Sequence, residues 1–272
     1  MESIKLPEHA LGARAESDRW LILWPGLGGT AEQFLRVLDE APNLDTNVLA
    51  LDPPGHGRTP EANHLTWDDV RHIWQRACDW IEGQGGRTVI IGGHSYGAYA
   101  ALGAGRDVRI EGYVLLDGGY LEPFPSFDRA AVEEANARYL SSRQFPSWSA
   151  FLAAERAESR RWDAYAEAAL KSAMVESGGV IQPIVTVPTA NQVSSLLSTY
   201  HVDELPADSR PMSLLLAGEP LDARMSREEA VNRFRARHPH TDAAFIPKSG
   251  HDVLLDNPDA VLENLVGFLR RL

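Results

Sequence analysis

Short apolar runs alternate with helical patterns over the first 120 residues of the chain. Each run has four or five residues that are apolar on both faces, and Gly, Pro or Asp residues lie at their boundaries. Such runs are typical of buried parallel strands, because helices cover both faces of a parallel sheet. The sequence therefore predicts strands at Trp20–Trp24, Asn47–Leu51, Thr88–Ile91 and Tyr113–Leu116.

The clearest helical pattern covers Trp67–Glu82. Its apolar residues, at positions 70, 73, 74, 77, 78 and 81, draw one stripe along a helix. Thr66, with Asp69 three residues later, is expected to cap the helix N-terminus. The stripe contains the single cysteine, Cys78, which we expect to be a core residue rather than a nucleophile.

The same alternation returns near the C-terminus, with strands predicted at Met212–Ala217 and Ala243–Ile246. A helix is predicted at Ser226–Arg237, and another is capped by Asn257 and runs from Pro258 to about Arg271. Repeated strand and helix units imply a parallel sheet with right-handed crossovers. We predict one α/β core domain, made of residues 1–120 and 207–272.

Residues 121–206 break this rhythm. They are rich in alanine, and a Pro-dotted stretch covers Val180–Pro188. We predict a helical cap (lid) subdomain over the carboxyl edge of the sheet, where α/β proteins bind ligands. The expected cap helices are Arg129–Leu140, Ser149–Glu158, Trp162–Val175 and Asn191–Tyr200.

Composition and charge narrow the possible partners. The 272 residues are 44% hydrophobic and 24% charged, as in ordinary globular proteins. With 26 basic and 38 acidic residues, the net charge of −12 argues against nucleic acid or an anionic membrane as a partner. No signal-like segment and no apolar run of spanning length is seen, and the lone cysteine fits a reducing compartment. We expect a cytoplasmic protein, a monomer or a homodimer.

Residues Gly93–Gly97 read Gly-His-Ser-Tyr-Gly, a G-x-S-x-G pattern. The pattern directly follows a predicted strand and precedes a helix of small residues, as a nucleophile elbow requires. Ser95 would then lie above the sheet, near a helix N-terminus with its positive dipole. The alternative is a glycine-rich turn with an inert serine.

A serine hydroxyl needs a base, and the base needs an orienting acid. His251 follows the last predicted strand at the same sheet edge as Ser95, so we expect it to be the base; otherwise it is a loop histidine that caps a turn. Asp222 follows the strand Met212–Ala217 and keeps the chain order Ser, acid, His. Asp222 is the preferred acid, while Asp117 and Glu219, which also follow strands at this edge, remain alternatives.

The oxyanion of acyl transfer needs two N–H donors. We expect them from Tyr96, next to the serine, and from Leu27, in the Gly-rich loop of Trp24–Thr30. Such a loop could cradle a phosphate instead. However, neither G-x-G-x-x-G nor G-x-x-x-x-G-K-[ST] occurs in the chain, so a nucleotide site is not expected.

These motifs together resemble the α/β-hydrolase fold superfamily. The loop Trp24–Gly29 resembles its H-G-x-x-G oxyanion loop with Pro25 in place of His, and Leu51–Thr59 is similar to its D-x-P-G-H-G-x-S turn. Ser249–His251 resembles its closing G-H. Gly218–Asp222 is one residue longer than the family's G-x-x-D, and some relatives place their acid after the earlier strand, where Asp117 lies.

The resemblance implies an α/β-hydrolase fold with a helical cap, no cofactor and no metal. A serine nucleophile implies a hydrolase of a small or medium acyl ester, including lactones and thioesters, and a small-molecule acyl substrate as the partner. An acyltransferase and a non-catalytic ligand-binding protein are the alternatives. Cap aromatics would line an apolar acyl pocket or attach the cap helices to the sheet. They are Phe124, Phe127, Trp148, Phe151, Trp162 and Tyr165.

Overall fold

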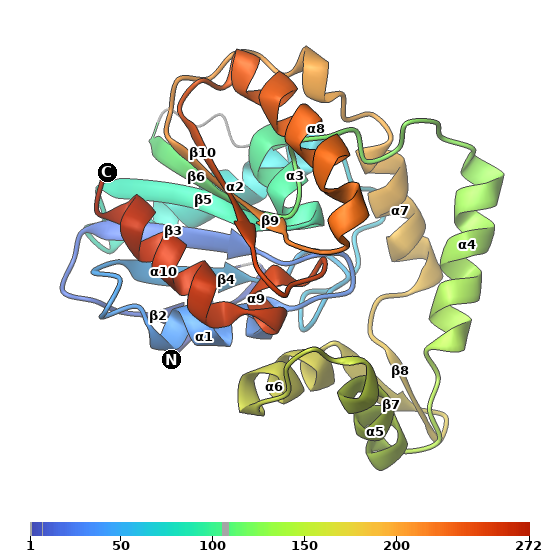
Figure 1. Ribbon diagram of the computed structural model, residues 1–272. Helices are drawn as coiled ribbons and strands as arrows, with labels where there is room; N and C mark the ends of the chain where they lie inside the picture. Colours follow the sequence, from blue (N-terminus) through green and yellow to red (C-terminus); the bar gives the residue numbers. More distant parts are fainter. Residues whose placement is uncertain (1, 7, 105–108) are drawn as a thin grey trace.

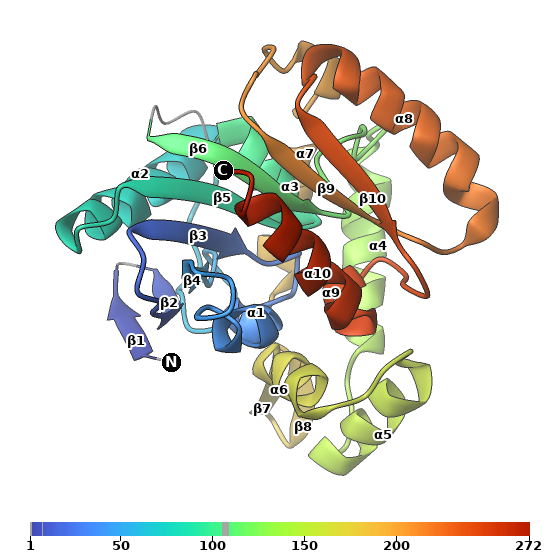
Figure 2. The ribbon, with the colours of Figure 1, turned by 60° about the vertical axis from the view of Figure 1, so that its left-hand side comes forward.

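A computed structural model describes residues 2–6, 8–104 and 109–272. Their main sheet has eight strands in the order β1-β2-β4-β3-β5-β6-β9-β10 and is strongly twisted (Figures 1 and 2). Neighbouring strands from β4 to β10 are parallel, whereas β1 and β2 form an antiparallel edge. The strands are β1 (Glu2–Lys5), β2 (His9–Ala13), β3 (Arg19–Trp24), β4 (Asn47–Leu51), β5 (Thr88–His94), β6 (Ile110–Leu116), β9 (Met212–Ala217) and β10 (Thr241–Ile246).

All six strands predicted from the sequence are present, which confirms the expected α/β class. Successive residues of β3 show why these strands are apolar on both faces: Trp20, Ile22 and Trp24 enter one buried cluster. Leu21 and Leu23 enter the cluster on the opposite face. Side chains alternate across a strand, so a strand covered on both sides is apolar throughout.

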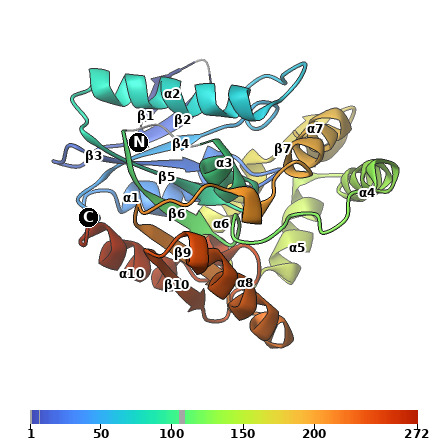
Figure 3. The same cartoon turned by 90° about the horizontal axis from the view of Figure 1, so that it is seen from above.

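Helices cover both faces, with α2 and α10 on opposite sides of the sheet (Figure 3). One cluster packs under α2, α3 and α8, and the other under α1, α9 and α10. No helix of the described residues is long and apolar enough to span a membrane. The helices are η1 (Ala31–Phe34), α1 (Leu35–Asp39), α2 (Trp67–Gly83), α3 (Tyr96–Ala104), α8 (Arg224–Arg237), α9 (Val253–Asp256) and α10 (Pro258–Leu269).

The N-terminal caps predicted for two helices are confirmed. Thr66 and Asp69 form the expected capping box at α2, and the predicted stripe is its buried face. Cys78 is part of that face and is 1% exposed. At α10, the Asn257 side chain accepts the Ala260 N–H, and Pro258 occupies the first turn.

The segment between β6 and β9 lies at one end of the sheet (Figure 1). It contains η2 (Val202–Glu204) and a two-stranded hairpin, β7 (Met174–Ser177) and β8 (Val180–Pro183). Its helices are α4 (Arg129–Ser142), α5 (Trp148–Glu158), α6 (Ala164–Ser172) and α7 (Val187–Leu197). We call residues 121–206 the inserted segment.

The bounds of two helices within the inserted segment were predicted wrongly. The helix expected to end at Val175 stops at Ser172, because Met174–Ser177 pairs with Val180–Pro183 instead. Gly178 and Gly179 make the turn, and both have the positive φ that glycine tolerates best. The last helix begins earlier than expected, at Val187, where Thr186 caps it and Pro188 lies in its first turn.

Candidate active site

Ser95 lies at the turn between β5 and α3 with a φ of 49°, an uncommon value for a residue with a side chain. Its N–H donates to the Leu116 carbonyl at 2.8 Å. A Cβ atom at Gly93 or Gly97 would lie 2.1 or 1.9 Å from the Trp24 carbonyl oxygen, so this close approach requires glycine. The motif therefore forms a tight strand-to-helix turn that holds Ser95 half-buried at the carboxyl edge of the sheet.

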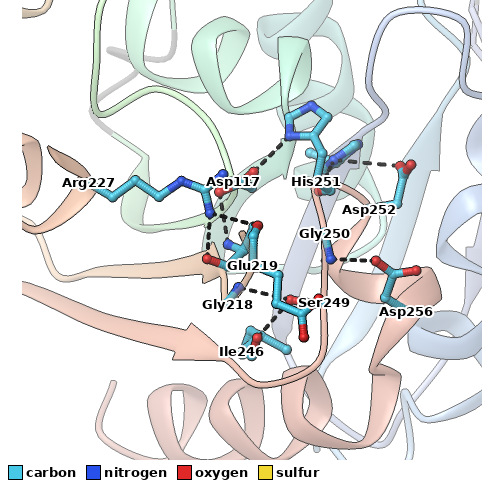
Figure 4. A network of polar contacts seen from close by, with 12 residues as sticks. Asp117, Gly218, Glu219, Arg227, Ile246, Ser249, Gly250, His251, Asp252 and Asp256 are labelled. Carbon is cyan, nitrogen blue, oxygen red and sulfur yellow. Dashed lines mark hydrogen bonds and ion pairs between the residues drawn. The ribbon is translucent and has the colours of Figure 1, made fainter. Parts of the chain in front are cut away.

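His251 lies in the loop between β10 and α9, and its partner is Asp117. His251 Nδ1 is 2.7 Å from Asp117 Oδ2 (Figure 4). Asp117 directly follows β6 and is 8% exposed. Its other oxygen accepts the Ala217 N–H at 2.9 Å, so the end of β9 fixes the carboxylate.

The preference for Asp222 as the partner of His251 was wrong. Asp222 is exposed in the short turn η3 (Leu221–Ala223), and His251 binds Asp117 instead. The path of the chain after β9 explains this, because Gly218 and Glu219 donate their N–H groups to the Ser249 side chain and carbonyl. Glu219, the third alternative, pairs with Arg160.

Electrostatics favour an ionised Asp117 beside His251. Burial disfavours charge on Asp117, but hydrogen bonds from His251 and Ala217 and nearby positive charges outweigh burial and lower the pKa of the carboxyl. The hydrogen bond to Asp117 raises the pKa of His251, against the effect of burial. A neutral His251 that donates from Nδ1 has its lone pair on Nε2, where it can accept a proton.

A chain of buried side chains connects the Gly-rich loop after β3 to the His251 loop. Gln33, in η1, accepts the Gly26 N–H through Oε1 at 3.3 Å. Its Nε2 lies 2.9 Å from His94 Nδ1, and His94 Nε2 lies 2.8 Å from the His251 carbonyl oxygen. Burial lowers the pKa of His94, so a neutral ring accepts from Gln33 and donates to His251.

Sequence reasoning did not identify this chain of hydrogen bonds. It treated His94 only as part of the serine motif and passed over Gln33. The available signal was weak: Gln33 lies one turn before Val37 and next to Phe34, both buried, but Glu32 and Arg36 are polar neighbours.

The expected N–H donors, Tyr96 and Leu27, flank Ser95. Tyr96 is the first residue of α3, where a helix leaves N–H groups without an intrahelical acceptor. Leu27 lies in the loop after β3 and lines the same cavity as Ser95. In the described part of the chain, no group of three His, Cys, Asp or Glu residues could hold a metal ion.

Two cavities adjoin both Ser95 and His251. The first, of about 370 Å³, lies between the loop after β3 and the inserted segment, and we call it the apolar cavity. The second, of about 350 Å³, we call the Arg227 cavity. The apolar residues of the first include Leu140, Phe151, Leu170, Met174 and Val185. The second is lined by Tyr99, Asp117, Tyr120, Leu121, Pro123, Phe124, Leu197 and Arg227.

Two of the six aromatic residues singled out in the sequence line these cavities: Phe151 the first and Phe124 the second. Other aromatics pack within the inserted segment or attach it to the core domain. Trp148 packs on Phe151, with ring centroids 6.1 Å apart. Tyr165 donates from its hydroxyl to Asp39, which connects α6 to α1.

The family of this chain follows from comparison with protein-family models. A model described as "Alpha/beta hydrolase family" matches residues 21–264. The chain is therefore a member of the α/β-hydrolase family, which confirms the resemblance drawn from its motifs. Membership supports a hydrolase and leaves open the bond that is cleaved.

Solved structures share this fold. E-2-(acetamidomethylene)succinate hydrolase is 14% identical, with 97% of this chain and 95% of that chain covered and a TM-score of 0.72. A marine microorganism esterase is 15% identical, with 97% and 100% covered and a TM-score of 0.70. An esterase of M. tuberculosis is 19% identical, with 99% and 91% covered and a TM-score of 0.67. A comparison with curated proteins finds no match.

Proposed function

We propose that this protein is a serine hydrolase that cleaves a small or medium acyl ester through Ser95, His251 and Asp117. The observation that carries the proposal is the 2.7 Å contact of His251 Nδ1 with the buried Asp117 carboxylate, at a sheet edge where Ser95 occupies a strained turn. Ser95 and His251 line the same two cavities, so a substrate in either cavity reaches both.

In the proposed reaction, Ser95 Oγ attacks the acyl carbon while His251 Nε2 takes the hydroxyl proton. Asp117 stabilises the imidazolium that forms. The N–H groups of Tyr96 and Leu27 stabilise the oxyanion. His251 then gives its proton to the leaving alcohol as the ester bond breaks. Water, deprotonated by the same histidine, releases the acid and restores Ser95.

The choice of an ester rests on the nucleophile and the apolar cavity. Five apolar side chains along that cavity would accommodate a short or medium acyl chain. Two of the structural neighbours are named as esterases, which supports the same chemistry. The neighbour named E-2-(acetamidomethylene)succinate hydrolase is named for a substrate with an acetamido group, so esters, lactones, thioesters and amides belong in one assay panel.

The test is an intact-mass measurement after treatment with a fluorophosphonate. One adduct is expected on the wild type and on Ser126→Ala, in which an exposed serine of the inserted segment is changed. No adduct is expected on Ser95→Ala. Wild-type protein should also hydrolyse p-nitrophenyl esters, with a loss of about 10⁶-fold in kcat for Ser95→Ala.

Three outcomes would contradict the proposal in different ways. A folded wild type with neither adduct nor turnover would favour a ligand-binding protein. An adduct that persists in Ser95→Ala would place the reactive group elsewhere. Acyl transfer to an added alcohol or amine in preference to water would identify an acyltransferase.

A further inference from the structure

We propose that the Arg227 cavity binds a carboxylate of the substrate, so that the preferred ester carries an anionic group close to the scissile bond. This inference rests on the proposed function, because it names the substrate class for the same serine.

Arg227, on α8, is held in place without an acidic partner. Its Nη1 donates to the Ala217 and Glu219 carbonyl oxygens at 2.6 and 3.3 Å (Figure 4). Among the described residues no carboxylate forms an ion pair with it, and its Nε and Nη2 groups donate to no other residue. The guanidinium is therefore fixed in position and keeps N–H donors for a ligand.

Other arginines around Ser95 differ in this respect. Arg143 lines the apolar cavity but is paired with Glu155. Arg160, near the loop after β9, is paired with Glu219 and lies 3.6 Å from Asp256. Of the described arginines that line the two cavities, Arg143 and Arg227, only Arg227 forms no ion pair with a carboxylate.

Asp117 does not take the place of a ligand. It interacts electrostatically with Arg227, but its two oxygens already accept from His251 and from the Ala217 N–H. Arg227 donates to backbone carbonyls instead. The remaining N–H groups of the guanidinium are therefore available to a ligand.

Tyr120 supplies an independent observation. The residue is 3% exposed and lines the same cavity. Its hydroxyl is not among the fully buried polar atoms and has no hydrogen-bond partner among the described residues, so it is accessible to a ligand in the cavity. Burial raises the pKa of Tyr120, so the hydroxyl stays protonated and can donate. Arg227 and Asp117 line the same cavity as Tyr120.

These groups suit a carboxylate better than a neutral group or a cation. A guanidinium offers parallel N–H donors that match the two oxygens of a carboxylate. The other walls include the apolar residues Leu121, Pro123, Phe124 and Leu197, which lower the local polarity and strengthen the attraction. A cavity of about 350 Å³ is at the small end for ligand sites, so the carboxylate would lie a few bonds from the acyl carbon.

The experiment compares anionic esters with neutral counterparts. The carboxylate is placed on the acyl side in 4-nitrophenyl hydrogen glutarate, against 4-nitrophenyl pentanoate. It is placed on the leaving-group side in 3-acetoxybenzoate, against its methyl ester. The measured quantity is the ratio of kcat/KM for the anionic to the neutral ester, after subtraction of spontaneous hydrolysis.

For at least one pair, Arg227→Gln should lower this ratio about 10- to 100-fold, the range expected for a lost charge-assisted hydrogen bond. Arg227→Lys should restore part of it, and Tyr120→Phe should lower it less. Arg224→Gln is the matched control, because Arg224 lies on the same helix but is paired with Glu228 away from the cavity. Its ratio should equal that of the wild type.

Two results would overturn the inference. If Arg227→Gln lowers turnover of anionic and neutral esters equally, Arg227 only supports the ionised Asp117, and the proposed function stands. If no ester is turned over, glutarate binding decides: glutarate should raise the Tm of the wild type and not that of Arg227→Gln. The same response in both proteins would rule out the carboxylate site independently of catalysis.

Discussion

The sheet and the inserted segment meet at Ser95 but are held together very differently. The sheet lies between two large buried clusters; Ser95 and Asp117 directly follow its strands, and His251 lies in the loop after β10. Within the described inserted segment, α7 joins the first of these clusters. The remainder has a separate cluster with only Phe151, Met174 and Ile181 at its centre, and α4 buries none of its side chains. This contrast suggests that the sheet edge fixes the chemistry, while the inserted segment sets the substrate and tolerates change.

After the loss of Ser95 itself, the largest effect should come from the acid at the sheet edge. We expect Asp117→Asn to lower kcat about 10³- to 10⁴-fold, because the asparagine would no longer stabilise the imidazolium or hold the correct tautomer. The matched control, Asp222→Asn, should stay within about twofold of the wild type, since Asp222 is exposed in η3. Steady-state kinetics on a soluble ester, with circular dichroism as the folding check, measures both. A larger loss in Asp222→Asn would reverse the assignment.

The same contrast explains how much of the molecule could be predicted. Apolar runs and helical stripes indicated six strands, α2 and α10, because burial on the faces of a sheet leaves a strong periodic pattern. The antiparallel strand β2 was missed, since His9–Ala13 is short and mixed in polarity. The β7–β8 hairpin was also missed, because pairing partners override helix propensity in an alanine-rich stretch.

Within the site, the sequence could place Ser95 and His251 at one edge but could not choose between three acids there. The choice depends on how the chain leaves β9. Ser249 accepts from Gly218 and Glu219, and Asp117 accepts from Ala217. These are contacts between residues about 30 to 100 positions apart, and no local pattern encodes them.

The next effect tests the chain of hydrogen bonds from Gly26 to His251. Gln33→Leu removes both contacts of the buried amide, so the Gly-rich loop and His94 lose their common anchor. We expect kcat to fall about 10- to 100-fold with KM little changed, because small displacements of reacting groups are costly. Gln192→Leu, which breaks a contact of α7 with Ala62, is the control. Equal losses in both variants would show a general loss of stability instead.

The pH dependence should follow His251. Because Asp117 raises the pKa of His251, the acid limb of kcat/KM lies above the pH expected for an ordinary histidine, and activity is lost as pH falls through that pKa. In Asp117→Asn the limb of the residual activity should move to lower pH. Stability has its own dependence: the contribution from the lowered pKa of Asp117 is lost as pH falls through its folded value. If the acid limb has the same pH midpoint in Asp117→Asn as in the wild type, a group other than His251 determines it.

The smallest effect should come from the inserted segment, and it should be one of selectivity. Leu140, half-buried on α4, lines the apolar cavity, so Leu140→Trp should shorten the acyl chain that the cavity accepts. We expect kcat/KM for an octanoate ester to fall about fivefold relative to an acetate ester, a modest change for a changed apolar pocket. Ala135→Trp, at an exposed position of the same helix, is the control and should leave the ratio unchanged. If Leu140→Trp instead lowers kcat for both esters as strongly as Gln33→Leu does, the inserted segment also positions the reacting groups, and the division between the two regions fails.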